Sequence, residues 1–154
     1  MLAPFASERF PFSSCGQHEP VVADSLYGLS YPAFPHPARV STYCAILPCA
    51  SQLNGCAFCI QYHLNVARKA GLASAKIDLV AAWRDAGIYS ARERAALAWT
   101  EALTLMSQRH VPDSLYEDVQ ATFTHQETVF LTSGLEAHCL HARLSINSTC
   151  IYHL

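Results

Sequence analysis

The sequence predicts an all-α fold. Between about residue 50 and residue 131, apolar residues recur at helical period, and no stretch alternates at period two for long. Two Ser/Thr-x-x-Glu patterns in this part are typical of helix N-termini; they are Ser90 with Glu93 and Thr124 with Glu127. We therefore expect a bundle of helices joined by short loops, with neighbouring helices antiparallel.

The first helix of this part is expected to run from Cys56 to about Gly71. Asn54 and Gly55 form a breaker that can also start a helix, with Asn54 as the cap. Lys69 suits the last turn of a helix because its charge complements the helix dipole, and Gly71 suits the position just past the end.

Further helices are expected in order along the chain. One begins with Ser74 as its cap and ends at Gly87, and the next begins at Ser90. Pro112 marks the first turn of another helix, and Thr124 marks the start of the last. The apolar positions expected to face the core are Ile77, Val80, Ala81, Trp83, Ala96, Leu97, Trp99, Leu103 and Met106.

The two flanks differ from this helical middle. Seven of the eight prolines lie before residue 50, and proline blocks helix interiors, so no long helix is expected there. Residues 21–30 are compatible with two helical turns. We divide the chain into an atypical Pro-rich segment (1–49), a helical core (50–132) and an atypical C-terminal segment (133–154).

Length and composition limit the possible functions. A chain of 154 residues predicts one domain, and a net charge of −2 gives no electrostatic footprint for nucleic acid or an anionic membrane. No apolar run approaches the roughly 20 residues of a membrane span, and the N-terminus does not read as a signal peptide. We expect a cytoplasmic protein whose thiols stay reduced, and the odd number of cysteines, seven, argues against a complete disulfide framework.

The stretch NGCAFCIQYH carries the strongest chemical signal. On a helix, Cys56, Cys59 and His63 share one face about two turns long. A helix N-terminus stabilises a thiolate, which favours Cys56 as the more acidic thiol. A dithiol with a nearby imidazole suffices for chemistry on a peroxide, because a thiolate attacks the O–O bond and the second thiol then forms a disulfide.

Two other interpretations of the same residues stay open. Free cysteines are among the most buried residue types, so the pair can be inert core. Alternatively, Cys56, Cys59 and His63 are three ligands of a zinc ion. The fourth ligand would then come from Cys44, Cys49 or Cys139. The histidines of the HCLH stretch, His138 and His141, are better explained as surface or core residues.

From about residue 50 to 131, the chain resembles the AhpD-like alkylhydroperoxidase family, within the carboxymuconolactone decarboxylase superfamily. The resemblance is carried by NGCAFCIQYH and by ERAALAWTEALT downstream. It implies an all-α protein that forms trimers or hexamers and a peroxidase that needs no cofactor. It also implies that Cys59 attacks the hydroperoxide, Cys56 resolves the intermediate and meets a lipoyl-type or thioredoxin-like dithiol reductant, and His63 joins a proton relay.

The chain departs from the family pattern at two places. The relay glutamate of the family falls at Cys44, and Pro48 is expected to interrupt the helix that would carry it. After residue 132 the sequence no longer follows the family's apolar helix. Our hypothesis is that residues of about 31–49 and 133–154 come from frameshifts, which the nucleotide sequence would test.

The interpretation that we favour is a thiol-dependent hydroperoxide reductase, with Cys56, Cys59 and His63 as catalytic residues and with activity weakened by the missing glutamate. The alternative is a degenerate, non-catalytic member of the family that senses redox state or serves a structural role. A lactone decarboxylase activity from the wider superfamily is a further alternative, although that chemistry needs no cysteine pair.

Overall fold

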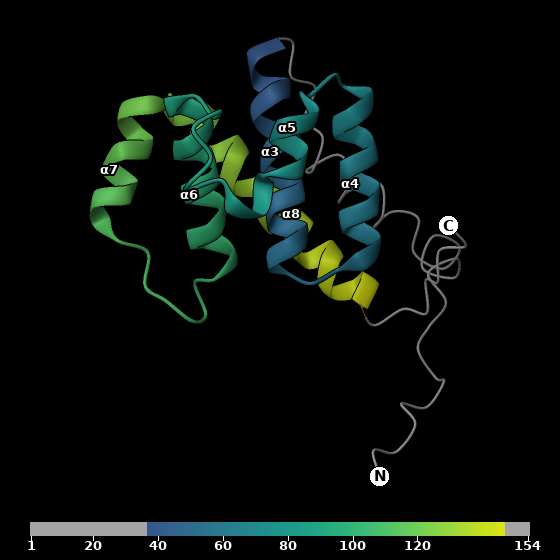
Figure 1. Ribbon diagram of the computed structural model, residues 1–154. Helices are drawn as coiled ribbons and strands as arrows, with labels where there is room; N and C mark the ends of the chain where they lie inside the picture. The colour runs from purple at the N-terminus through teal and green to yellow at the C-terminus, as the bar shows by residue number, and fades with distance from the viewer. Residues whose placement is uncertain (1–36, 147–154) are drawn as a thin grey trace.

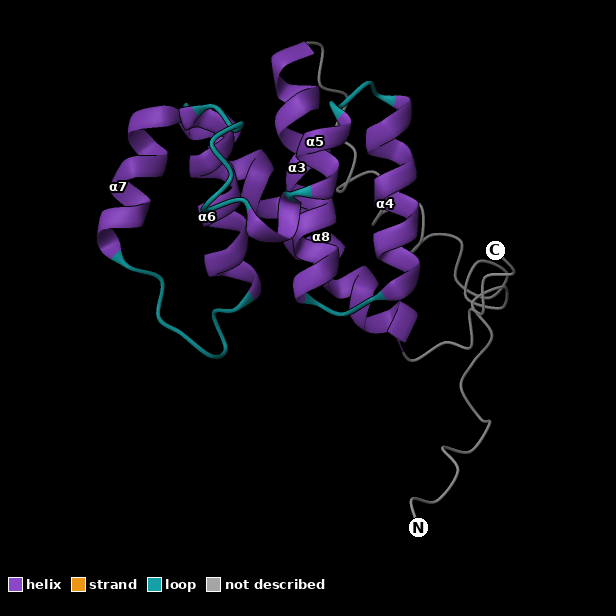
Figure 2. Cartoon of the chain, in the orientation of Figure 1, coloured by secondary structure: helices purple, strands orange, loops and turns teal. Residues whose placement is uncertain are grey.

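The computed structural model describes residues 37–146, and every regular element in that part is helical (Figures 1 and 2). The prediction of an all-α fold is therefore confirmed. The elements are α3 (Pro37–Leu53), α4 (Ala57–Lys69), α5 (Ser74–Asp78), the 3-10 helix η1 (Val80–Ala82), α6 (Ala91–Thr104), α7 (Asp113–Thr122) and α8 (His125–Ile146). The two helical turns expected at residues 21–30 lie outside the described residues.

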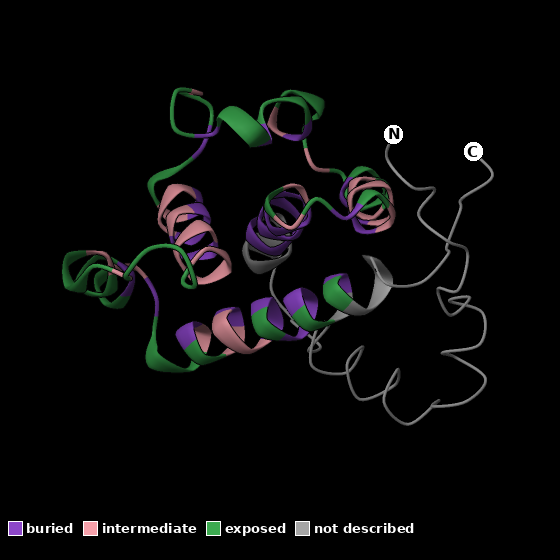
Figure 3. Ribbon diagram, turned by 90° about the horizontal axis from the view of Figure 1, so that it is seen from below, coloured by how far each residue is buried: buried purple, intermediate pink, exposed green. Residues whose placement is uncertain are grey.

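Helix α3 is the centre of the bundle. It packs against α4, α5, η1, α6 and α8, and Figure 3 shows it surrounded by the other helices. Every residue from 42 to 51 is buried, as expected for a helix that is apolar on all sides. The fully buried side chains of this helix include Ile46, Pro48 and Ser51.

The prediction that the Pro-rich segment holds no long helix was wrong, and so was the prediction that Pro48 interrupts one. Helix α3 runs from Pro37 to Leu53 with Pro48 inside it. A proline in a helix interior costs about 3 kcal/mol. Burial of a single large apolar side chain contributes roughly 1.5–3 kcal/mol, and α3 buries several, so tertiary packing outweighs the local cost.

The segment from Ser74 to Gly87 is not one helix. Helix α5 ends at Asp78 and η1 follows, while Ser74 is the first helical residue and Ala73 occupies the cap position. Buried side chains recur every third residue here, which is the period of a 3-10 helix; they are Ile77, Val80 and Trp83. The remaining predicted core position of this segment, Ala81, is exposed.

Helix α6 begins with the predicted capping box. The Ser90 hydroxyl accepts from the Glu93 backbone N–H at 3.2 Å, and the Ser90 N–H donates to the Glu93 carboxylate at 2.8 Å. Its predicted core residues Ala96, Leu97 and Trp99 are buried. Leu103 is partly buried, but Met106 lies beyond the end of the helix and is 55% exposed.

Helix α8 begins with the second predicted capping box, in which Thr124 and Glu127 exchange backbone-to-side-chain hydrogen bonds. It then continues without a break through residue 132, where the sequence departs from the family pattern. Its buried face includes Leu131, Leu135, His138 and Ala142. The division into segments at residues 49 and 132 and the frameshift hypothesis stay predictions. No helix in the described part is long and apolar enough to cross a membrane.

Candidate functional site

The N-terminus of α4 places the two cysteines of the motif. Cys56 is the N-cap residue, and its Sγ accepts a hydrogen bond from the Cys59 backbone N–H at 3.3 Å. Gly55 precedes it with φ +65°, a left-handed conformation that glycine adopts without strain. The expected helix start was thus correct to one residue, but the cap is Cys56 and not Asn54.

The buried stripe of α4 carries the rest of the motif. Cys59, His63 and Ala67 are the buried residues of this helix, and they follow one another at a spacing of four. Residues at this spacing lie one above the other on a helix face, so Cys59 and His63 point into the same side of the bundle. The predicted common face is therefore the buried face.

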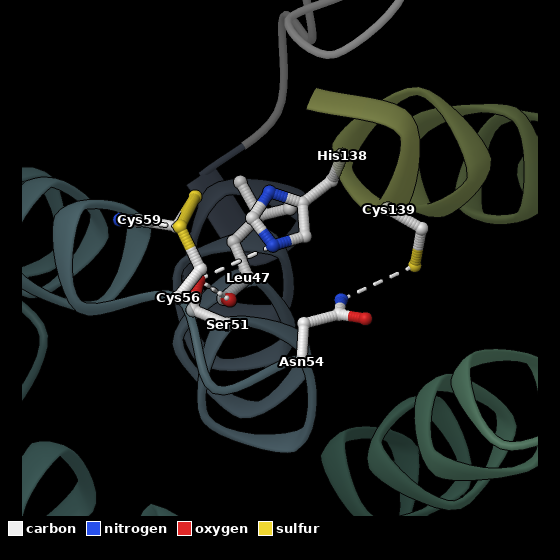
Figure 4. Close-up of a disulfide and its surroundings, with 7 residues drawn as sticks. All are labelled: Leu47, Ser51, Asn54, Cys56, Cys59, His138 and Cys139. Atoms are coloured by element: carbon white, nitrogen blue, oxygen red, sulfur yellow. Dashed lines mark hydrogen bonds between the residues drawn. A yellow bond between two sulfur atoms is a disulfide. The ribbon is translucent and has the colours of Figure 1, made fainter. Parts of the chain in front are cut away.

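Cys56 and Cys59 form a disulfide, with their Cα atoms 5.3 Å apart (Figure 4). Both residues are almost fully buried, at 2% and 1% exposure. They form a small cluster with Ala142 of α8, and Phe58 packs against its outer side. The cysteine pair is thus buried in a cluster that α8 shares through Ala142.

His63 lies between two other rings. Its centroid is 5.1 Å from the Tyr62 ring and 4.8 Å from the His138 ring of α8, and both contacts are edge-to-face. His63 is 6% exposed and His138 is 2% exposed. Two imidazoles from distant parts of the chain therefore meet in the core beside the helix that carries the disulfide.

Ser51 of α3 holds His138 in place. The Ser51 Oγ lies 3.2 Å from His138 Nε2, and its hydroxyl donates to the Leu47 carbonyl at 2.7 Å (Figure 4). A serine hydroxyl has one proton. With that proton donated to Leu47, Ser51 accepts a hydrogen bond from His138 in the tautomer that carries a proton on Nε2.

The other predicted site positions do not join this cluster. Cys44, where the family's relay glutamate would stand, packs with Ala67 and Ile77 in a separate apolar cluster, and burial raises the pKa of its thiol. Burial and the charge of Glu101 raise the pKa of Cys49 to about 12, against an opposing effect of Arg84. Both thiols are therefore weak nucleophiles.

The zinc interpretation finds no support in the described part of the chain. Within residues 37–146, no three His, Cys, Asp or Glu side chains are grouped so as to hold a metal ion. Cys139 contacts Asn54 Nδ2 at 3.5 Å and Thr104 Oγ1 at 4.0 Å instead. The three cysteines proposed as a fourth ligand are thus spread over separate environments.

Sequence reasoning missed His138 and Ser51 as residues of the site. His138 was expected at the surface or in the core, and the structure places it in the core against His63. The only local sign of a role for His138 was the HCLH stretch, which does not indicate that His138 contacts His63 and Ser51. Ser51 and His138 are 87 positions apart, so only the folded chain brings them together.

Comparison with known proteins bears on the family and the fold. Residues 49–102 match the model of the carboxymuconolactone decarboxylase family. The fold is similar to the crystal structure of a protein of unknown function from Agrobacterium tumefaciens, a putative antioxidant defence protein AhpD, with a TM-score of 0.85 and 25% identity over 96% of this chain and 99% of that one. Together, the family match and the structural similarity support the assignment of the chain to the AhpD-like group of the carboxymuconolactone decarboxylase superfamily.

A curated relative of this AhpD-like chain is the uncharacterized protein YdfG of Bacillus subtilis. The two are 42% identical over 81 residues, which are 53% of this chain and 55% of YdfG. The chain thus matches only about half the length of this curated relative.

Proposed function

We propose that this AhpD-like protein is a thiol-dependent hydroperoxide reductase that acts through Cys56, Cys59 and His63. The observation that carries the proposal is the disulfide at the N-terminus of α4, with a buried imidazole one turn further along the same stripe. A cysteine pair that is close enough to oxidise, with a base on the same face, is what the two-thiol reduction of a peroxide requires.

The reaction is balanced by the two thiols. The thiolate of Cys59 attacks the outer oxygen of the hydroperoxide, so an S–O bond forms, the O–O bond breaks, and the alkoxide takes up a proton and leaves as an alcohol. Cys56 then attacks the sulfenic acid on Cys59, which forms the disulfide and releases water. A dithiol reductant, of the lipoyl or thioredoxin-like class, restores both thiols by exchange and is itself oxidised.

The position of the two cysteines at the start of α4 also affects which thiol attacks the hydroperoxide. Cys56 is the cap residue, and its sulfur receives the Cys59 backbone N–H, so the helix N-terminus favours a thiolate on Cys56. The family resemblance assigns the attack to Cys59. We keep Cys59 as the attacking thiol, and the two single variants described below separate the assignments.

The second candidate is a redox switch without turnover. Burial of both sulfurs favours it, since a protein reductant reaches them only if α8 or Phe58 moves. The redox switch is also favoured by the buried Cys44, which stands where the family has its relay glutamate.

The resemblance supports two further proposals: the protein assembles as a homo-oligomer, a trimer or a hexamer, and it works without a cofactor. The sequence pattern supports a third, that the protein works in the cytoplasm.

The deciding experiment is consumption of cumene hydroperoxide in the presence of a dithiol reductant. The wild type should turn over, and Cys59→Ser should be inactive. Reduced Cys56→Ser, freed from excess reductant, should consume one equivalent of hydroperoxide and stop at the sulfenic acid. Cys139→Ser is the matched control, because it changes a buried thiol outside the pair and should keep turnover. A wild type that forms its disulfide and unfolds cooperatively, yet consumes no hydroperoxide, would replace the reductase by the redox switch.

A further inference from the structure

Two buried imidazoles meet behind the dithiol, and only one of them belongs to the sequence motif. His63 comes from the buried stripe of α4, and His138 comes from α8. Their centroids are 4.8 Å apart with the rings at 74°. Two such rings do not both carry a positive charge, because like charges this close in a poorly solvated core repel strongly.

The hydrogen bond to Ser51 defines the chemistry of His138. In the tautomer that donates Nε2–H to Ser51, the neutral ring has Nδ1 as its basic nitrogen. The Ser51 hydroxyl is itself held by the Leu47 carbonyl, so the ring is anchored to α3 through two successive hydrogen bonds. His138 is thus an imidazole whose orientation is set by its contact with α3.

The same helix also contacts the dithiol. Ala142 lies one turn after His138 on α8 and packs against Cys56 and Cys59. Two successive turns of α8 therefore contact the site: Ala142 packs with the cysteine pair, and His138 contacts the His63 ring. This arrangement fixes the position of His138 relative to the cysteine pair and to His63.

We propose that His138 is the proton-holding partner of His63. It is a positioning residue, because it acts through His63. The inference rests on the proposed function and extends it: the proton that leaves a thiol as its thiolate forms is shared by the two imidazoles and returns to the alkoxide when the O–O bond breaks. His138 would thus take over the role of the family's relay glutamate, which is to hold a proton. This chain has Cys44 at the position of that glutamate, and Cys44 packs in a separate apolar cluster.

The test compares His138→Gln with the wild type. Glutamine can still donate an N–H to Ser51 from about the same place, but it cannot take up a proton. The rate of alkylation of the reduced pair by iodoacetamide, and the rate of hydroperoxide consumption, should both fall by about 10²-fold, the lower end of what a general acid–base group contributes. KM for the hydroperoxide and the melting temperature should stay close to those of the wild type.

The controls separate this role from packing. Glu136→Gln lies on the exposed side of the same helix and should leave both rates unchanged. His138→Gln with wild-type rates would overturn the proposal, because packing and the Ser51 contact alone would then suffice. If His138→Gln does not fold, Ser51→Ala decides: it removes the anchor and should slow alkylation several-fold, whereas an unchanged rate would overturn the proposal.

The two proposals fail in different ways. A wild type that consumes no hydroperoxide defeats the proposed function, but iodoacetamide still reports the reactivity of the reduced dithiol. In that case a slow His138→Gln variant would still support proton sharing between the imidazoles, and wild-type reactivity in the variant would defeat it.

Discussion

At the scale of single residues, close approach between helices decides which side chains are allowed. Gly134 of α8 faces Tyr43 of α3, and a Cβ at position 134 would lie 1.6 Å from Tyr43 Oη and 2.8 Å from Cζ. Tyr43 is buried, and burial raises the pKa of its hydroxyl to about 12. This glycine is required by the packing of α3 on α8, and no turn is involved.

Gly134→Ala should destabilise the protein by about 1–3 kcal/mol, the usual cost of overpacking a well-filled core. Urea unfolding followed by circular dichroism measures the change. The double variant Tyr43→Phe with Gly134→Ala should recover part of the loss, because it removes the atom nearest to the new methyl group. No difference between the single and the double variant would show that the tyrosine moves away at little cost.

At the scale of elements, one carboxylate joins α5 to α6. Glu93 closes the capping box of α6 and also binds Lys76 of α5, with an Nζ–Oε1 distance of 2.6 Å. Burial acts to raise the pKa of Glu93, but the hydrogen bonds from Lys76 and Ser90 outweigh it and hold the pKa below its ordinary value. The ionised form is therefore the one that stabilises the fold.

The sign of the pH dependence follows from this lowered pKa. Glu93 contributes its full stabilisation above the unfolded pKa of about 4.3 and loses it as the pH falls through the lower folded value. Glu93→Gln can keep the capping hydrogen bond but loses the charge. It should cost about 1.5–3 kcal/mol at neutral pH, the range of hydrogen bonds to charged groups.

Unfolding of Glu93→Gln and the wild type in urea at a series of pH values measures this effect. The difference in stability should shrink below about pH 4.3 and vanish once the wild-type carboxylate is protonated. A difference that is the same at every pH would show that the charge of Glu93 plays no part.

At the scale of the whole molecule, stability comes from the packing of helices around α3. The main core cluster draws residues from α3, α6, α8 and the segment around η1, whereas the disulfide lies in a small cluster of its own. The two cysteines are only three positions apart, so their bond closes a very short loop. Reduction of the disulfide should therefore leave the main core in place.

Reduction should lower the free energy of unfolding by no more than about 2 kcal/mol, because a short loop restrains the unfolded chain only slightly. The measurement compares urea unfolding of the oxidised protein with that of the protein kept in a phosphine reductant. Far-ultraviolet circular dichroism should show the same helix content in both forms. A large loss of helix on reduction would mean that the N-terminus of α4 needs the bond in order to fold and to pack against the rest of the bundle.

The helical class, the two capping boxes and the place of the dithiol at a helix N-terminus could all be predicted from the sequence. These features depend on residues within one or two turns of each other, so a local pattern is enough to predict them. The position of His63 on the same face as Cys59 follows from the spacing alone.

Tertiary structure decided the rest. Helix α3 forms despite Pro48 because burial on all sides outweighs the local cost, and the segment after Ser74 breaks because its buried residues recur every third position. His138 enters the site through contacts with residues that are far away in the sequence, Ser51 and His63. Such contacts exist only after α3, α4 and α8 have packed, and no pattern within α8 could reveal them.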